Sequence, residues 1–188
     1  MEHKQRISTK KIVFTALMAA LVAVGSALRI TLPMDIGGNT SFHLGNIFCA
    51  LAGILLGPWL GGTAAGLGSA IYDMMNPAYI AECWLTFLMK GAYGLTAGLI
   101  IHSGKQDWGY FKSTAATVTG AVTYAVLYLI KSYFKPIIVQ GVAAQAAWLT
   151  VIGKLPATIF NAVVAIVCAP ILAVAIRKAL EQNRLTLE

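Results

Sequence analysis

Long apolar stretches alternate with short polar segments along the chain. A helix needs about 20 mostly apolar residues to cross a bilayer core that is about 30 Å thick. Six stretches approach or exceed this length, which predicts six membrane helices. The predicted helices cover residues 12–32, 44–60, 61–75, 80–101, 114–130 and 142–176. The third is short, whereas the last is longer than a span requires, so we expect it to tilt or to extend outside the bilayer.

The composition points to the same class of protein. Hydrophobic residues make up 58% of the 188 residues and charged residues 11%, and the mean hydropathy is +0.74. Soluble domains average about 45–50% apolar and about 25% charged residues. Six helices in a chain of this length leave no room for a soluble catalytic domain. We therefore expect an all-α integral membrane protein, a six-helix bundle that forms one domain over residues 1–188.

The distribution of basic residues predicts the orientation of the bundle. They precede the first predicted helix, flank the connection between the fourth and fifth, and follow the last: Lys4, Arg6, Lys10, Lys11, Lys105, Lys112, Arg177, Lys178 and Arg184. With an even number of spans these regions lie on one side, which the positive-inside rule makes the cytoplasm. We expect both termini to be cytoplasmic in the cell membrane of a bacterium. The net charge of +7 then needs no nucleic acid as a partner.

The outer connections in this orientation are residues 33–43, 76–81 and 131–141. They are rich in polar, aromatic and turn-forming residues, whereas the inner link at 58–62 is short. This contrast favours the capture of a molecule from outside the cell.

The glycine-rich stretch 55–77 does not fit a nucleotide-binding loop. Gly61 and Gly66 have the spacing of a P-loop, but Leu67 stands where the loop requires lysine. Glycines four residues apart instead allow close packing of helices in lipid. The three cysteines have no metal-site spacing, and no catalytic triad or pair of catalytic carboxylates is evident. We expect no enzyme activity, no cofactor and no metal.

Ionisable residues at membrane depth are costly and are candidates for function. Asp73, Glu82, Lys90 and Lys154 are of this kind, and aromatic residues cluster near them. Two alternatives stay open: a carboxylate neutralises Lys90 or Lys154 in a structural ion pair, and the aromatic residues form a belt at the membrane surface. The candidate substrate-binding residues are Asn39, His43, Asp73, Tyr79, Glu82, Trp84, Lys90, Tyr128, Tyr133, Phe134 and Trp148.

Small residues recur along the first predicted helix. Ala16, Ala20 and Ala23 follow one another at intervals of three or four residues, which places them near one helix face. This face packs either against the chain's own helices or against another membrane subunit.

Two segments resemble a known family. They are FHLGNIFCALAGILLGPWLGGTAAGLGSAIYDMM at 42–75 and FLMKGAYGLTAGLI at 87–100. Both are similar to the substrate-binding S components of energy-coupling factor (ECF) vitamin transporters, in particular to the riboflavin-type and hydroxymethylpyrimidine-type branch.

The resemblance implies that the chain binds a vitamin from outside and has partner subunits. Such a subunit docks on a transmembrane coupling subunit that carries two ATPases, and it topples in the membrane to carry the ligand inward. The family's docking stripe is an Ala-x-x-x-Ala pattern on the first helix, which Ala16, Ala20 and Ala23 match. ATP hydrolysis is then expected in the partner subunits.

The substrate stays open at this point. The general likeness favours cobalamin, with pyridoxine or hydroxymethylpyrimidine as alternatives. A self-sufficient small transporter or channel, and a purely structural membrane subunit, are alternatives from other classes.

Overall fold

The computed structural model of the chain describes residues 8–32, 39–104 and 109–183. The elements, in chain order, are α1 (Thr9–Ala27), β1 (Arg29–Leu32), β2 (Thr40–His43), α2 (Gly45–Met74), the short 3-10 helix η1 (Ile80–Glu82), α3 (Cys83–His102), α4 (Tyr110–Gln140) and α5 (Ala144–Gln182). Five helices in this part of the chain are long and apolar enough to cross a membrane: α1, α2, η1 with α3, α4 and α5. The expectation of an integral membrane protein is met.

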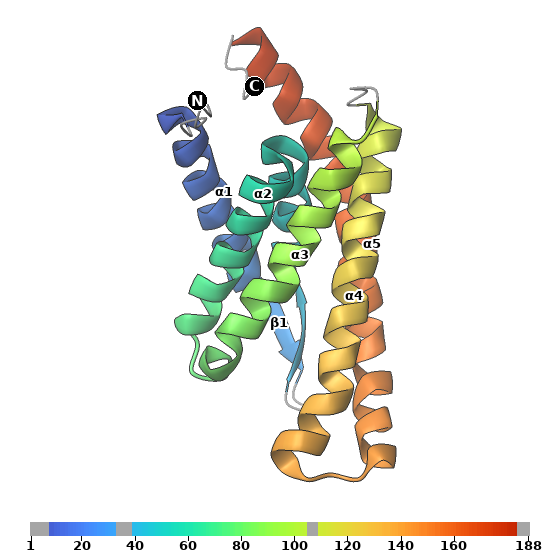
Figure 1. Cartoon of the computed structure of the whole chain (residues 1–188). Helices are drawn as coiled ribbons and strands as arrows, with labels where there is room; N and C mark the ends of the chain where they lie inside the picture. Colours follow the sequence, from blue (N-terminus) through green and yellow to red (C-terminus); the bar gives the residue numbers. More distant parts are fainter. Residues whose placement is uncertain (1–7, 33–38, 105–108, 184–188) are drawn as a thin grey trace, which may run out of the picture.

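The helix α2 covers the second and third predicted helices. It is interrupted at Gly57, whose backbone has φ 81° and ψ −178°, and Pro58 follows. Glycine adopts this positive φ without steric cost. The two parts of α2 lie against each other, because a Cβ at Gly61 would collide with the carbonyl oxygen of Ala52. Figure 1 shows α2 reversing its direction at this break, which comes earlier than the predicted boundary after residue 60.

A small β-hairpin replaces part of the first predicted helix and of the first outer loop. The helix α1 ends at Ala27, and β1 pairs with β2 in antiparallel register, with Arg29 opposite His43. The predicted helix was therefore wrong for residues 29–32, and the predicted outer loop contains a strand at 40–43, while the other described elements are helices. Neither four-residue strand is long enough to show a clear period of its own, and each needs the other to satisfy its backbone groups. Residues 33–38, between the strands, lie outside the described residues.

The helices α4 and α5 are longer than predicted. Residues 131–140, expected as an outer loop, belong to α4, which continues through Pro136. At 1.5 Å per residue α4 is about 46 Å long, more than the bilayer core of about 30 Å. Figure 1 shows α4 and α5 reaching past the other helices at the end of the bundle opposite to the two termini.

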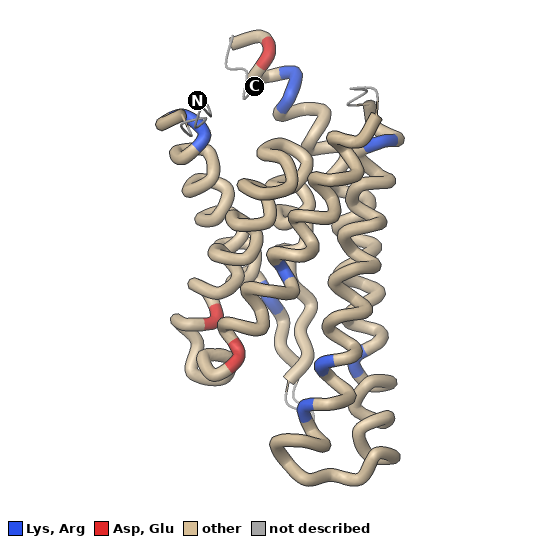
Figure 2. The backbone as a smooth tube through the Cα atoms, viewed as in Figure 1, with Lys and Arg blue, Asp and Glu red and all other residues tan. Residues whose placement is uncertain are grey.

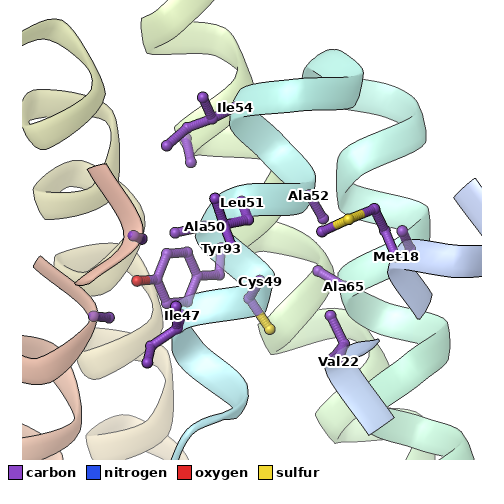
Figure 3. Packing of buried hydrophobic residues seen from close by; sticks show 14 of the residues in the cluster. Met18, Val22, Ile47, Cys49, Ala50, Leu51, Ala52, Ile54, Ala65 and Tyr93 are labelled. Carbon is purple, nitrogen blue, oxygen red and sulfur yellow. The ribbon is translucent and has the colours of Figure 1, made fainter. Parts of the chain in front are cut away.

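The core between α1, α2 and α3 is built from small residues. A Cβ at Gly53 would collide with the carbonyl oxygen of Gly94, so the backbones of α2 and α3 are in direct contact there. Figure 3 shows Met18 and Val22 of α1 facing Ala52 and Ala65 of α2. The predicted packing role of the glycine-rich stretch 55–77 is confirmed at Gly66 and Gly68, where a Cβ would collide with the carbonyl oxygens of Phe87 and Ala19.

Charged residues occupy two zones of the bundle. Figure 2 shows basic residues at the end where the termini lie, and a second set of basic and acidic residues in the opposite half. The part of the bundle between these two zones carries few charged residues in this view. The second set surrounds the cavity described next.

Candidate ligand-binding site

The hairpin and the helices α2 to α5 enclose a cavity of about 140 Å³. Seven of the eleven predicted binding residues line it: Asn39, His43, Asp73, Tyr79, Glu82, Lys90 and Tyr128. They come from five different parts of the chain, which the fold brings together around one space. Their role in binding stays a prediction.

The other four candidates lie outside the cavity. Trp84, Phe134 and Trp148 are each at least half exposed, at 60%, 51% and 57%. The ring of Tyr133 packs against Phe134 and Trp148, with centroids 5.1 Å apart in both pairs. These positions fit the alternative of an aromatic belt near the membrane surface, because α4 and α5 extend beyond the other helices there.

The cavity also contains residues that were not among the eleven candidate substrate-binding residues, although Lys154 had been noted as an ionisable residue at membrane depth. They include Arg29 on β1, Tyr124, Lys131 and Lys135 on α4, and Lys154 and Asn161 on α5. Arg29 was expected near the end of a helix, and Lys131 and Lys135 were expected in a loop. The spacing of Lys131 and Lys135, one helical turn apart, was the available signal that both face the same side.

Asn161 attaches the hairpin to α5. Its side-chain oxygen accepts a hydrogen bond from the backbone N–H of His43 at 2.9 Å, and its side-chain nitrogen donates to the carbonyl oxygen of Ser41 at 2.8 Å. Phe42 lies between these residues and meets Phe160 edge to face, with centroids 5.0 Å apart. One amide side chain therefore satisfies two backbone groups of β2 and positions the wall of the cavity that the hairpin forms.

Glu82 forms the ion pairs at one side of the cavity. Its carboxylate binds the ammonium groups of both Lys131 and Lys135 and so connects η1 to α4. One expectation was a structural ion pair between a carboxylate and Lys90 or Lys154. At Glu82 the partners are instead Lys131 and Lys135.

Lys90 is buried beside neutral groups. Its side chain is 3% exposed, donates a hydrogen bond to the side-chain oxygen of Asn46, and lies 4.0 Å from the ring centroid of Tyr124. Tyr124 stacks on Tyr128 with centroids 5.7 Å apart. The ammonium of Lys154 lies 5.6 Å from the ring centroid of Tyr128. Two parallel rings with lysines over their faces thus form one wall of the cavity.

Arg29 is held between two aromatic rings. The guanidinium lies 4.0 Å from the centroid of Tyr72 and 4.9 Å from that of Tyr79, and its Nε donates to the carbonyl oxygen of Ser26 at 2.7 Å. Stacking of this kind fixes the plane of a guanidinium.

His43 is a neutral group in this site. Burial lowers the pKa of its imidazole well below the usual value, and the positive charges of Lys90 and Arg29 lower it further. Its Nδ1 accepts a hydrogen bond from the backbone N–H of Gly45 at 3.2 Å, so the proton of the neutral ring is on Nε2. His43 therefore offers a neutral N–H donor.

The described residues include no group of three histidine, cysteine or acidic side chains that is placed to hold a metal ion. The arrangement of flat rings, ammonium groups, carboxylates and a neutral imidazole around a small space suits the noncovalent binding of a polar molecule.

Comparison with known proteins identifies a family and two relatives. The sequence model of one family, described as ECF-type riboflavin transporter, S component, matches residues 6–178. A UPF0397 protein of Streptococcus gordonii is 29% identical over 151 residues, which cover 73% of this chain and 78% of that protein. A protein of Pyrococcus woesei described as uncharacterized is 28% identical over 114 residues, which cover 61% of this chain and 72% of the relative.

A solved structure has a similar fold. The crystal structure of the S component for biotin from an ECF-type ABC transporter matches with a TM-score of 0.59 at 15% sequence identity. The match covers 92% of this chain and 94% of that one. At this identity the likeness concerns the fold alone.

These findings determine the class of the protein. S components are integral membrane proteins that bind the substrate of a transporter and are not enzymes. They act with an ECF module, which consists of a transmembrane subunit and ATPase subunits. Because the family match extends over nearly all of the sequence, the chain belongs to the family of ECF-type riboflavin transporter S components.

Proposed function

We propose that this chain is the vitamin-binding S subunit of an ECF importer, in which it captures a vitamin from outside the cell. The observation that carries the proposal is the cavity of about 140 Å³, in which the hairpin and four helices enclose polar and aromatic side chains. A mostly preformed cavity with a few placed hydrogen-bonding groups is typical of sites for small molecules. Asn39, His43, Asp73, Tyr79, Glu82, Lys90 and Tyr128 are the proposed contacts.

The proposed orientation has both termini in the cytoplasm and the cavity in the outer half of the membrane. Basic residues at the end with the termini support this, as the positive-inside rule expects. The reversal of α2 at Gly57 supports counting its two parts as separate spans. With that count the bundle has six spans, and residues 1–188 form one membrane domain.

The size of the cavity bears on which vitamin is bound. Cobalamin, which the general likeness favours, is a corrinoid far larger than a space of about 140 Å³. A vitamin with a single ring, of the size of pyridoxine or hydroxymethylpyrimidine, suits the volume better. We therefore infer a small vitamin as the substrate.

The partner is proposed to dock on α1. Ala16 and Ala20 are exposed on this helix and Ala23 is half-buried, whereas Met18 and Val22 face the core. The stripe of small residues is therefore available on the outer surface of the bundle. A transmembrane coupling subunit with two ATPases is the proposed partner.

Binding is tested with the purified full chain in detergent micelles. Calorimetry with a panel of B vitamins and their precursors should find at least one ligand, and mass spectrometry should find the same molecule retained after purification. A panel without any binding would contradict the proposal. Uptake into liposomes without partner subunits or ATP would instead favour a self-sufficient transporter.

Docking is tested by placing a large side chain in the stripe of alanines on α1. Ala20→Trp should abolish co-purification with the coupling subunit and leave the affinity for the vitamin unchanged. Val122→Trp, at an exposed position on α4, is the matched control and should not affect co-purification. Equal recovery of the coupling subunit with both variants would place the docking surface elsewhere.

A further inference from the structure

Positive charge exceeds negative charge in the lining of the cavity. Among the described residues that line it, five carry cationic side chains and two carry carboxylates. The cations are Arg29, Lys90, Lys131, Lys135 and Lys154, and the carboxylates belong to Asp73 and Glu82. Charged groups removed from water are costly unless opposite charges compensate them. The excess of cations around this partly open cavity therefore favours a negative charge on the molecule that fills it.

The lysines of α4 already have a carboxylate partner. Glu82 binds both Lys131 and Lys135. Its single negative charge is thus shared by two cations.

Lys90 and Arg29 donate hydrogen bonds to neutral groups, and the carboxylate of Asp73 lines the same cavity. Neither side chain forms an ion pair with any carboxylate in residues 8–32, 39–104 and 109–183. Lys90 donates to the amide oxygen of Asn46, and an ammonium has two further N–H groups. Arg29 donates to a backbone carbonyl through Nε, and the rest of its planar group is suited to bind a carboxylate or phosphate through two parallel hydrogen bonds.

His43 and these two cations lie around the same cavity. The charges of Lys90 and Arg29 both act on its imidazole, where they add to burial in lowering the pKa. All three residues line the same cavity. An anion between Lys90 and Arg29 would also be within the region where His43 offers a neutral donor.

We propose that the ligand of this cavity carries an anionic group, a carboxylate or a phosphate, and that Lys90 and Arg29 hold it. This inference rests on the proposed function, that the cavity binds a small vitamin. The stacked rings of Tyr124 and Tyr128 then flank the ring of the ligand.

The test uses pairs of vitamins that differ in this group alone or nearly so. The pairs are nicotinate and nicotinamide, biotin and biotinamide, pantothenate and pantothenol, and pyridoxal 5′-phosphate and pyridoxal. Calorimetry on the purified full chain should find at least one acid that binds about tenfold or more tightly than its neutral counterpart, because a hydrogen bond to a charged group contributes about that factor.

Variants of the two cations locate the effect. Lys90→Met and Arg29→Gln should each weaken binding of that acid by about tenfold and change binding of the neutral counterpart by less than about threefold. Arg29→Lys keeps the charge and should keep most of the preference for the acid. Lys178→Gln, at an exposed position on the last turns of α5, is the control and should alter neither affinity. Arg29 is only half-buried, so its two variants decide the question if Lys90→Met does not fold.

Four outcomes would overturn the inference. Equal affinity within every pair, or binding of uncharged vitamins such as riboflavin and pyridoxine alone, would exclude the anion requirement while vitamin binding stands. Loss of acid binding on addition of phosphatidylglycerol to the micelles would assign Lys90 and Arg29 to a lipid headgroup. Absence of binding by every vitamin would overturn the proposed function and this inference with it.

Discussion

The contact between α2 and α3 and the cavity beside it differ in how they hold the bundle together in lipid. At the contact, glycines bring two backbones together so closely that a Cβ at Gly53 has no space. At the cavity, large polar and aromatic side chains of the hairpin and of the helices line the space between them. In lipid no hydrophobic force joins helices, so close packing and polar contacts have to do so. The comparison indicates that the rigid part of the bundle is built from small residues and the binding part from buried polar groups.

The largest loss of stability is expected where the backbones of α2 and α3 are in contact. A Cβ at Gly94 would lie 2.7 Å from the carbonyl oxygen of Gly61 and 3.0 Å from the Cβ of Ala65. Gly94→Ala should therefore lower the free energy of unfolding by about 3 kcal/mol, as overpacking does. Unfolding in mixed micelles with increasing SDS measures this.

Gly91 provides the matched control on the same helix. A Cβ there would be 3.4 Å from the carbonyl oxygen of Gly62, an ordinary contact. Gly91→Ala should change stability by no more than about 1 kcal/mol, since alanine is favoured in a helix by about that amount. Equal losses for the two variants would contradict the distinction between close contact and ordinary packing.

The next effect concerns the attachment of the hairpin. Asn161→Ala leaves the N–H of His43 and the carbonyl of Ser41 without their partner, which should cost about 2 kcal/mol. Hydrogen exchange should show lower protection of β2 together with weaker ligand binding. Asn183→Ala removes an exposed side chain that bonds to Ala179 and should leave both measurements unchanged. Unaltered exchange in Asn161→Ala would show that the hairpin does not depend on α5.

A smaller effect separates the aromatic residues of the cavity from those outside it. Tyr128→Ala removes a ring that stacks on Tyr124 and should weaken ligand binding by about 1 kcal/mol. Trp148→Ala removes a ring that is 57% exposed and outside the cavity, so the affinity should not change. Calorimetry with the retained vitamin measures both variants, and a loss confined to Trp148→Ala would move the site to the ends of α4 and α5.

The smallest effect is a dependence of stability on pH. The pKa of His43 is lowered by burial and then by Lys90 and Arg29, so the unfolded chain takes up this proton before the folded one. The folded protein should lose stability as the pH falls below about 6.5, the usual pKa of histidine. His43→Gln should reduce the slope of unfolding free energy against pH between about 6.5 and 5. An identical slope in the variant would mean that His43 does not contribute.

The site could be predicted in part because a charged side chain at membrane depth is energetically costly and is therefore a candidate for function. Asp73 and Lys90 were identified as charged groups at membrane depth, and both line the cavity. Trp84 and Trp148 were chosen because they are aromatic and near such groups in the sequence, yet exposed aromatic residues of a membrane surface have the same pattern. Arg29 was missed because its position depends on a hairpin whose two strands are separated by seven residues.

The class of the protein and most of its helices follow from the hydropathy of the chain. Backbone groups have to be satisfied within each segment that crosses lipid, so long apolar runs specify helices locally. Three features instead required the folded chain: the reversal of α2 at Gly57, the pairing of β1 with β2, and the ion pairs of Glu82 with Lys131 and Lys135. These features depend on contacts between residues far apart in the chain. A hydropathy pattern describes each residue with its neighbours in sequence and carries no record of such contacts.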